Sequence, residues 1–516
     1  MTGVKGTVSI CLSLLPELFA AIESIAEPVR QRVEAELAEL ASDLAVRTQP
    51  VVRLEAAEER ALDDAVRVFA DDVPCPFSRA TIAAALAYAT ETVAVELDSG
   101  VVVERLRDEA GSRPELVGET LALVVRTAVS AQPGAVFASS RESAARSVLD
   151  LGMPLAARDG DAEATEGFDP VESSIAALAA PTIDVLVDRD YLRFLASLDP
   201  GAERFPLLRD GLFVELGLRL PAFHFRVDEE LRPAAFAFRV NSVRTLPRIG
   251  LPAGTIMVND TAERMSDVHG VAAEPTVNPA TDQPCSLASA QHAAALEELG
   301  LTTWDPFGYL ILSLAAALRR SAHTLMTRDV ASAMVGELRY AFPFLADATA
   351  EYVRPDVLAR ALRELLLERV SIRNLRRILE LLIRHETEQR DDGAGSVAFV
   401  RAGLAEQVAH AVARGTATVV AYLLDEPFES AFLEQADAAT STGPDSLAEQ
   451  LRAAVRIELR ELPATAAVPA LLTADAVRRP IADVLRHEFP QLRVLGYRDL
   501  PFDRNVQPIA RILAPT

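Results

Sequence analysis

The first part of the chain shows both hydrophobic periods of regular secondary structure. Residues 7–12 (TVSICL) alternate apolar and polar positions, as a strand with one buried face does. Val33, Leu37, Leu40 and Leu44 are spaced by three and four residues, which is the period of one helix face. Extended along the chain, this pattern predicts strands over 7–12, 50–54 and 62–69, and helices over 27–44, 81–88 and 116–129.

After a polar, acidic stretch at 157–166, which is typical of a linker, a similar pattern begins again. It predicts strands over 182–187, 221–227 and 234–240, with a helix over 207–216. The repeated order suggests that residues 1–145 duplicate the architecture of 170–327. This hypothesis aligns Pro50 with Pro221, Leu62 with Leu231, Pro74-Cys75 with Pro284-Cys285, and Pro114 with Pro306. The alternative is a chance likeness, because strand–helix–strand units often look alike.

Beyond residue 327 the pattern becomes helical and then alternates between helices and strands. Apolar residues on one face predict a helix over 357–370 and a second helix that runs to 384, with Ser371 as its N-cap. The last part predicts helices and strands in alternation, which is typical of a mostly parallel sheet. The expected helices are 396–414, 447–459 and 477–488, and the expected strands are 417–424, 467–472 and 492–495.

These elements predict a mixed α/β (α+β) fold of several small subdomains. The expected units are an N-terminal α/β unit (1–156), a linker (157–169), two α/β subdomains (170–327), a helical subdomain (328–390) and a C-terminal subdomain with a parallel-type sheet (391–516). The length of 516 residues is ample for several buried cores.

The charge balance narrows the choice of partners. The chain carries 51 Lys and Arg against 75 Asp and Glu, a formal net charge of −24, which argues against nucleic acid or an anionic membrane as the main partner. Cys11, Cys75 and Cys285 are too far apart for a disulfide framework or a zinc motif, so a reducing compartment is expected. No targeting segment or membrane span is apparent, and a soluble, cytoplasmic protein is the expectation.

Signatures of catalysis are missing from the sequence. It has no phosphate-binding loop, no dinucleotide fingerprint, no G-x-S-x-G and no H-E-x-x-H. No two of the seven histidines lie four residues apart, and a position on a helix surface or in a core accounts for each of them. We therefore predict no enzyme activity, no cofactor and no metal; a small-molecule enzyme remains the weaker alternative.

Six residues are candidates for contact with a partner or a second subunit. Trp304 precedes Asp305-Pro306, which reads as a helix N-cap followed by proline at the first helical position. Arg373, Arg376 and Arg377 offer cations to an acidic partner, unless they form salt bridges with Glu364, Glu368 and Glu380. The sixth candidate, Tyr497, lies near the C-terminus.

Three stretches of the sequence resemble the FHIPEP family of flagellar and virulence type III secretion export-gate proteins. Residues 370–380 (VSIRNLRRILE) resemble the family's "VSIRDLRTILE", and residues 303–330 resemble its "DP…HL…" segment. A third likeness joins Leu471-Leu472-Thr473, Phe489-Pro490 and Tyr497 to the family's "VLTSPRVRP…EREFPDLAVLSYNEIP". The likeness covers residues 170–516, about two thirds of the chain.

This resemblance implies a cytoplasmic body of four subdomains that docks secretion chaperones and export substrates. It also implies a homo-oligomeric ring with contacts through the helical subdomain, although a monomer is plausible. The family's membrane half and its signature loop are not found, so no gating role is expected. The predicted function is a protein-docking and assembly platform in protein export; the alternative is a diverged scaffold or regulatory protein unrelated to secretion.

Overall fold

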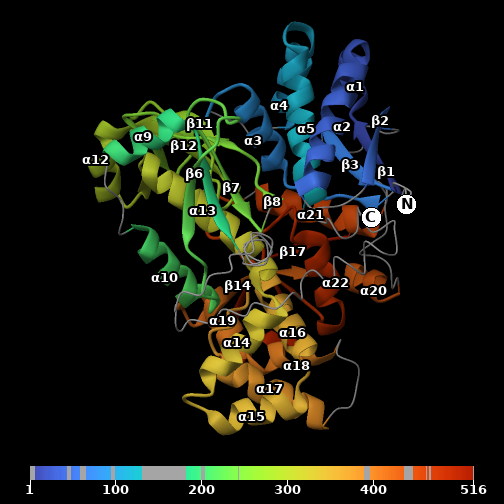
Figure 1. Ribbon diagram of the computed structural model, residues 1–516, viewed down its shortest axis with the longest axis vertical. Coiled ribbons are helices and arrows are strands. Elements are labelled where there is room, and N and C mark those ends of the chain that lie inside the picture. The colour runs from blue at the N-terminus through green and yellow to red at the C-terminus, as the bar shows by residue number, and fades with distance from the viewer. Residues whose placement is uncertain are drawn as a thin grey trace, which may run out of the picture.

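The computed structural model describes residues 6–43, 48–57, 65–71, 73–93, 99–130, 182–198, 204–241, 243–388, 395–434, 446–460, 462–463 and 466–514. Across this part of the chain, four small sheets and a helical region form the molecule, which confirms the mixed α/β class (Figure 1). The predicted linker at 157–166 and Leu62 lie outside the described residues.

The N-terminal unit is a four-stranded sheet with two long helices on one face. Its strand order is β2-β1-β3-β4, with β1 parallel to β2 and antiparallel to β3. Alternate residues of β1, from Val8 to Leu14, are fully buried beneath α2 and α5, as the alternation predicts. The elements are β1 (Gly6–Leu14), α1 (Pro16–Ile22), α2 (Ala26–Asp43), β2 (Thr48–Ala56), β3 (Val66–Ala70), β4 (Val73–Pro74), α3 (Arg79–Ala89), α4 (Ser99–Ser112) and α5 (Pro114–Ser130).

The second unit has a sheet of the same topology. Its order is β6-β5-β7-β8, again with the first strand parallel to the second and antiparallel to the third, and β9 extends the pairing of β7. The elements are β5 (Ile183–Val187), α9 (Arg189–Leu198), α10 (Arg204–Leu216), β6 (Phe223–Val227), β7 (Ala235–Val240), β8 (Val243–Arg244), β9 (Arg248–Ile249) and α13 (Pro306–Ser321).

The backbone hydrogen bonds of the two units also correspond. The amide of Asp71 donates to Ser9 O at 2.8 Å, and the amide of Asn241 donates to Thr182 O at 3.1 Å. Both turn residues have a positive φ, 46° for Asp71 and 47° for Asn241, which Asp and Asn tolerate better than most residues. The register that joins Ile10 to Ala70 in one unit joins Ile183 to Val240 in the other.

One predicted correspondence is wrong. Cys75 donates its amide to Val68 O at 2.8 Å just after β4, and the equivalent bond after β8 runs from Thr245 to Phe238 O at 2.7 Å. Cys285 instead lies in a third sheet, which is inserted between β9 and α13. The shared Pro-Cys pair therefore does not mark equivalent positions in the two units. That sheet has the strand order β11-β12-β10-β13. The segment that forms it comprises β10 (Thr255–Val258), α11 (Ala262–Asp267), β11 (Glu274–Val277), β12 (Pro284–Ser289), α12 (Ala293–Glu298) and β13 (Thr303–Trp304).

The helical region follows α13 and forms the lower end of the molecule in Figure 1. It contains α14 (Arg328–Leu338), α15 (Pro343–Tyr352), α16 (Pro355–Leu367), α17 (Leu375–Glu388) and α18 (Gly395–Gly403). Two predictions are corrected here. Ser371 is not an N-cap, because α17 begins only at Leu375, and the predicted helix 396–414 is two helices that are separated at Leu404.

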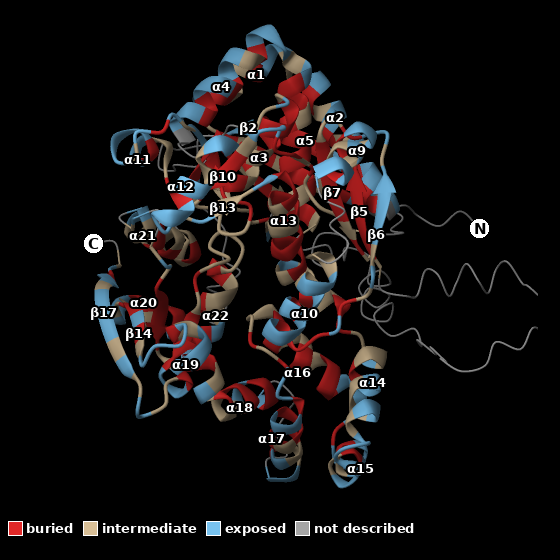
Figure 2. Ribbon diagram, turned by 90° about the vertical axis from the view of Figure 1, so that its left-hand side faces the viewer, coloured by how far each residue is buried: buried red, intermediate tan, exposed pale blue. Residues whose placement is uncertain are grey.

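The C-terminal unit has a sheet that is parallel throughout, as expected, with the order β16-β15-β14-β17. The sequence pattern did not predict β17, an outer strand whose side chains are mostly exposed (Figure 2). The elements are α19 (Ala405–Ala413), β14 (Thr418–Leu424), α20 (Glu426–Glu434), α21 (Leu447–Arg460), β15 (Ala470–Thr473), α22 (Asp475–Leu485), β16 (Val494–Gly496), the short 3-10 helix η5 (Tyr497–Asp499) and β17 (Asn505–Ile512).

The N-terminal unit packs against the second unit. Leu186, Ala235, Ala237 and Ile249 point to the side of the β5–β7 sheet opposite α13 and belong to the same buried core as the N-terminal helices. Arg232 strengthens this contact, since its guanidinium donates to Glu91 Oε1 at 2.9 Å and also bonds to Glu119. The N-terminal unit therefore covers a sheet face that would otherwise be exposed to solvent.

Candidate functional site

Trp304 and Asp305 lie where β13 leads into α13. Trp304 is half-buried and pairs with Met257 across the sheet, so it is a packing residue as well as a surface residue. Asp305 is the N-cap of α13, and its Oδ1 accepts from the amide of Gly308 at 2.5 Å with Pro306 at the first helical position. This confirms the predicted cap, which satisfies an amide that the helix itself leaves unpaired.

A cluster of aromatic side chains lies beside this helix start. The ring of Phe205 packs edge-on against Phe223, Phe225 and Phe307, with centroid distances of 4.9 to 6.0 Å. The guanidinium of Arg204 lies 5.3 Å from the Phe307 ring centroid and reaches Asp305 Oδ2 at 3.4 Å. We call Phe205, Phe223, Phe225 and Phe307 the aromatic surface.

The aromatic surface remains partly open to solvent. Phe225 is 40% exposed, and its strand β6 is the outer strand of its sheet, with one edge unpaired by any described strand (Figure 2). An exposed aromatic group on a free strand edge offers both apolar contact and main-chain hydrogen bonds to a peptide. The alternating Phe223-His224-Phe225 was a signal for the aromatic surface in the sequence. Phe205 and Phe307 are distant in the sequence and join these residues only in the folded chain.

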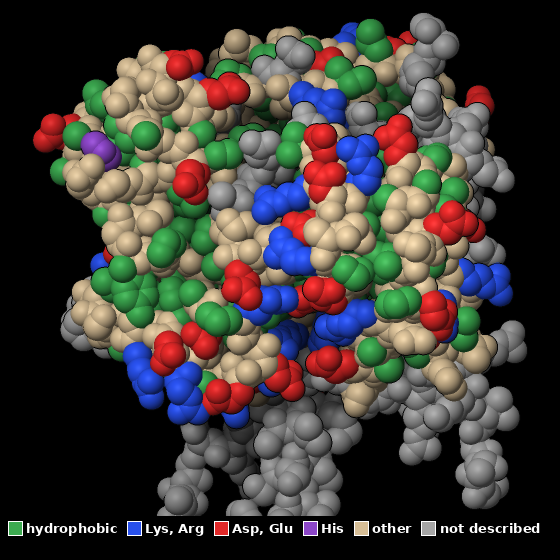
Figure 3. All heavy atoms as spheres, turned by 90° about the horizontal axis from the view of Figure 1, so that it is seen from above, with side chains coloured by type: hydrophobic (Ala, Val, Ile, Leu, Met, Phe, Trp, Pro, Cys, Tyr) green, Lys and Arg blue, Asp and Glu red, His purple; other side chains and the backbone are tan. Residues whose placement is uncertain are grey.

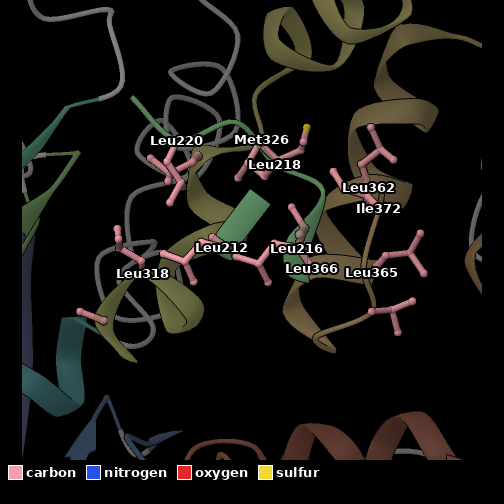
Figure 4. Packing of buried hydrophobic residues seen from close by; sticks show 14 of the residues in the cluster. Leu212, Leu216, Leu218, Leu220, Leu318, Met326, Leu362, Leu365, Leu366 and Ile372 are labelled. Carbon is pink, nitrogen blue, oxygen red and sulfur yellow. The ribbon is translucent and has the colours of Figure 1, made fainter. Parts of the chain in front are cut away.

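The segment before α17 forms a junction between units. The amide of Ile372 donates to Leu216 O at 2.8 Å, and Gln407 Nε2 donates to Ser371 O at 2.6 Å. A Cβ on Gly217 would lie 2.1 Å from the Arg373 nitrogen, so only glycine fits there. Figure 4 shows Leu212 and Leu216 between Leu318 of α13 and Leu365 and Leu366 of α16, beside Ile372. The segment is held extended by these contacts, which is why Ser371 caps no helix.

The three candidate arginines have different environments. Arg376 Nε donates to Glu380 Oε1 at 2.8 Å, and its guanidinium lies 5.1 Å from the Phe342 ring centroid. Arg377 is 3.6 Å from Glu380, while Arg373 is exposed ahead of the helix. The salt bridges considered from the sequence are thus present at Glu380 but not at Glu364 or Glu368.

Glu364 and Glu368 pair instead with arginines of later helices. Glu368 accepts two bonds from Arg478, at 2.8 and 2.9 Å, and one from Arg401 at 2.6 Å. Burial opposes the charged form of Glu368, but Arg401 and Arg478 outweigh it and hold the pKa of Glu368 below its ordinary value. Arg401 also grips both oxygens of Asp499 at 2.9 and 3.0 Å. These four side chains, which we call the Glu368 cluster, join the helical region to the C-terminal unit.

Tyr497 is 56% exposed in η5, close to the Glu368 cluster. Asp499 Oδ2 accepts from the amide of Gly496 at 2.9 Å, so the turn that carries Tyr497 is fixed from below by Arg401. The six candidates therefore belong to three separate places: the start of α13, the start of α17 and the turn after β16. They do not form one site.

A second exposed aromatic group, which was not predicted from the sequence, lies on the helical region. Tyr340 and Phe344 are almost fully exposed, and Phe342 between them is the ring beneath Arg376. The stretch Arg339-Tyr340-Ala341-Phe342-Pro343-Phe344 was a visible signal, because three aromatics in five positions are unusual for a surface segment of a chain with 5% aromatic residues. We call Tyr340, Phe342 and Phe344 the aromatic tip.

The distribution of charge on one face and the grouping of possible metal ligands among the described residues bear on two other kinds of site. On the face seen from above, basic and acidic side chains are interspersed (Figure 3). Over the residues that the structure describes, no three His, Cys, Asp or Glu side chains are grouped to hold a metal ion. None of the described helices combines the length and the apolar character needed to cross a bilayer.

Comparison with known proteins gives one family. The model of the FHIPEP family matches residues 123–505. Low calcium response locus protein D of Yersinia pestis is 24% identical over 344 residues, which are 64% of this chain and 48% of that protein. Flagellar biosynthesis protein FlhA of Bacillus subtilis is 25% identical over 352 residues, 66% of this chain and 49% of that protein. The chain thus spans about half the length of these curated relatives.

Solved structures share the fold. The Chlamydia pneumoniae CdsV protein, 23% identical, superposes with a TM-score of 0.57 over 64% of this chain and 98% of that one. A nonameric EscV cytosolic domain from the type III secretion system, 16% identical, gives 0.50 over 64% of this chain and 97% of that one. CdsV has also been solved in a complex with the CdsO protein. At this level of identity the likeness concerns the fold.

Proposed function

The chain belongs to the FHIPEP family, and from that premise we propose that it is a non-enzymatic docking and assembly platform of a type III protein export apparatus, located in the cytoplasm. The observation that carries the proposal is the aromatic surface, which lies within the matched residues 123–505 and remains open to solvent at Phe225. An apolar surface of this kind on a folded unit is typical of a protein-binding site.

The proposed partner at the aromatic surface is an export substrate or its chaperone. Partly exposed phenylalanines anchor apolar side chains of a partner, and Arg204, which already contacts Asp305, adds a polar group beside Phe307. The free edge of β6 allows an extended segment of the partner to pair with the backbone. Trp304 supports this surface through its sheet contacts rather than by direct binding.

For assembly we propose the aromatic tip as the contact between subunits. The nonameric EscV domain shows that a protein of this fold forms a ring. Tyr340 and Phe344 would lose a large exposed apolar area in such a contact, and Arg376 already holds Phe342 in place. Arg373 and Tyr497 remain candidates for polar contacts at the same or a neighbouring interface.

We further propose that residues 6–130 and 182–321 arose by internal duplication. The support is the shared strand order, the shared register and the matching turn residues Asp71 and Asn241. In β2 the positions that correspond to Phe223 and Phe225 are Val52 and Leu54. The N-terminal copy therefore lacks the aromatic surface, and we assign it the role of covering the second unit rather than that of a second docking site.

A pair of matched variants tests the docking proposal. Phe225→Ser removes an aromatic group that is 40% exposed on outer strand β6, and Ile509→Ser removes an apolar group that is 44% exposed on outer strand β17. Binding of a chaperone–substrate complex from the same export system would be measured by biolayer interferometry. We expect Phe225→Ser to weaken binding about 30-fold, which corresponds to about 2 kcal/mol, and Ile509→Ser to leave it unchanged. Equal affinities for all three proteins would reject this surface.

A further inference from the structure

A large cavity lies at the centre of the molecule, away from the aromatic surface. Its volume is about 940 Å³. The N-terminal unit, the turn between β7 and β8, the end of α13, the loop after α16, and the C-terminal unit all contribute to its wall. This volume is at the upper end of the range of small-molecule pockets in proteins.

The wall of the cavity is strongly basic in an otherwise acidic protein. Among the described residues, ten arginines and four carboxylates line it, whereas the whole chain carries a net charge of −24. Three of the carboxylates are already paired, since Glu215, Glu368 and Asp483 each bind an arginine within 2.9 Å. The surplus of positive charge is therefore concentrated on the remaining arginines.

Arg320, Arg369 and Arg493 lack a carboxylate partner at salt-bridge distance in the described structure. Arg369 donates to Gln491 Oε1 at 3.4 Å, and Arg493 donates to the carbonyl oxygens of Glu368 and Arg369. Arg320 lies at the end of α13 on the cavity wall, where burial lowers the pKa of its guanidinium and the charge of Asp282 offsets part of that effect. Three guanidinium groups from three different units thus face one hollow space.

The electrostatic environment shows that these cations are crowded. Burial, followed by repulsion from Arg320 and Arg319, lowers the pKa of Arg369 to about 10. Burial, followed by repulsion from Arg369 and Arg401, lowers the pKa of Arg493 to about 10. Both stay charged at neutral pH, and carboxylates of the wall offset part of this repulsion: Glu215 and Asp282 attract Arg369, and Glu215 and Glu368 attract Arg493. Two histidines on the wall, His323 and His487, stay neutral because burial lowers the pKa of each to about 4 and about 3.

We propose that this cavity binds a small polyanion that carries a polyphosphate group. Guanidinium groups present fixed, planar pairs of N–H donors that match phosphate oxygens. Arg320, Arg369 and Arg493 supply the charge, and the neutral histidines lie on the same wall, where Arg486 Nε already donates to His487 Nε2 at 3.2 Å. Because the wall is built from several units, the bound anion joins these units and stabilises their relative arrangement.

The test uses the full chain and inorganic tripolyphosphate as the probe. Binding is measured by isothermal titration calorimetry at pH 7.5 and about 0.15 M salt, where screening limits non-specific attraction to a length of about 8 Å. We expect saturable binding at one site and a rise in the thermal midpoint with tripolyphosphate concentration. No saturable heat would overturn the proposal.

Two substitutions with the same change in charge separate the cavity from general electrostatics. Arg320→Gln removes one crowded cation, and Arg193→Gln removes a cation that is 70% exposed on α9. Arg320→Gln should weaken tripolyphosphate binding at least 10-fold, and the thermal midpoint of the free variant shows whether the protein still folds. Arg193→Gln should change the affinity less than 2-fold. Equal losses in both variants would show non-specific binding and refute the site.

Two further ligands identify what the cavity recognises. ATP contains the same triphosphate, so tighter binding of ATP than of tripolyphosphate would support a nucleotide as the natural ligand, and equal binding would support an inorganic polyphosphate. A hexaglutamate peptide tests the alternative ligand, an acidic protein segment. Binding of the peptide with no binding of tripolyphosphate would overturn the proposal in favour of an acidic protein segment.

Discussion

Removal of the Glu368 carboxylate charge should destabilise the protein strongly, although the residue takes no part in the proposed docking. Glu368→Gln preserves the shape of the side chain but leaves Arg478, whose side chain is 10% exposed, without the carboxylate that it grips at 2.8 and 2.9 Å. Breaking a buried ion pair by removing one partner costs about 3–5 kcal/mol. Glu368 is 18% exposed, and Arg401 still has Asp499 as a partner in the variant. We therefore expect the free energy of unfolding to fall by about 3 kcal/mol, the lower end of this range.

Urea unfolding followed by circular dichroism measures this loss as a lower midpoint at an unchanged slope. Glu388→Gln is the matched control, because Glu388 pairs with Arg384 at 3.1 Å on the surface of α17, where both side chains are more than half exposed. Such a pair is worth less than about 1 kcal/mol. A loss of stability in Glu368→Gln no greater than in Glu388→Gln would refute the structural role given to the cluster.

The remaining predictions concern pH, backbone geometry and thiol reactivity. The pKa of Glu368 is lowered in the folded protein, so its contribution is present above the unfolded value near 4.3, and the stability difference between wild type and Glu368→Gln should shrink as pH falls below that value. Gly217→Ala should lower stability by more than about 1 kcal/mol in urea unfolding, because Gly217 has a φ of 77° and its Cβ would collide with Arg373; a neutral result would contradict the close approach. Burial raises the pKa of the Cys75 thiol to about 12 and raises that of Cys285 as well, so a thiol reagent at pH 8 should modify both far more slowly in the folded protein than in urea. Rapid modification of either in the folded state would contradict its burial.

The sequence predicted elements well where burial imposes a clear period. Strands β1, β5, β7 and β14 were located within a few residues, because each has alternating or continuous burial. The third sheet was not predicted, since β10, β11 and β13 have four residues or fewer and are too short to show a period. Its insertion also explains why Cys75 was matched with Cys285 although their surroundings differ.

Long-range contacts account for the features that local sequence could not predict. Ser371 has the side chain of an N-cap, but the bond from Ile372 to Leu216 O keeps the segment extended until Asn374. The Glu368 cluster joins side chains that are up to 131 positions apart, and each of them alone resembles an ordinary surface charge. Among the six candidate residues, Asp305 is a cap as predicted, because its partner Gly308 lies three positions away, and the salt bridges considered for Arg376 and Arg377 are present at Glu380 on the same helix.

The most direct test of the docking and assembly platform is the molar mass of the protein in solution. Light scattering would be recorded over a range of concentrations, alone and with a chaperone–substrate complex, for the wild type and for Phe344→Ser at the aromatic tip. The account predicts a mass that rises above the subunit mass of 55.6 kDa with concentration or with partner, and a weaker rise with concentration for Phe344→Ser. A mass of one subunit at all concentrations, with no increase on addition of the partner, would contradict it.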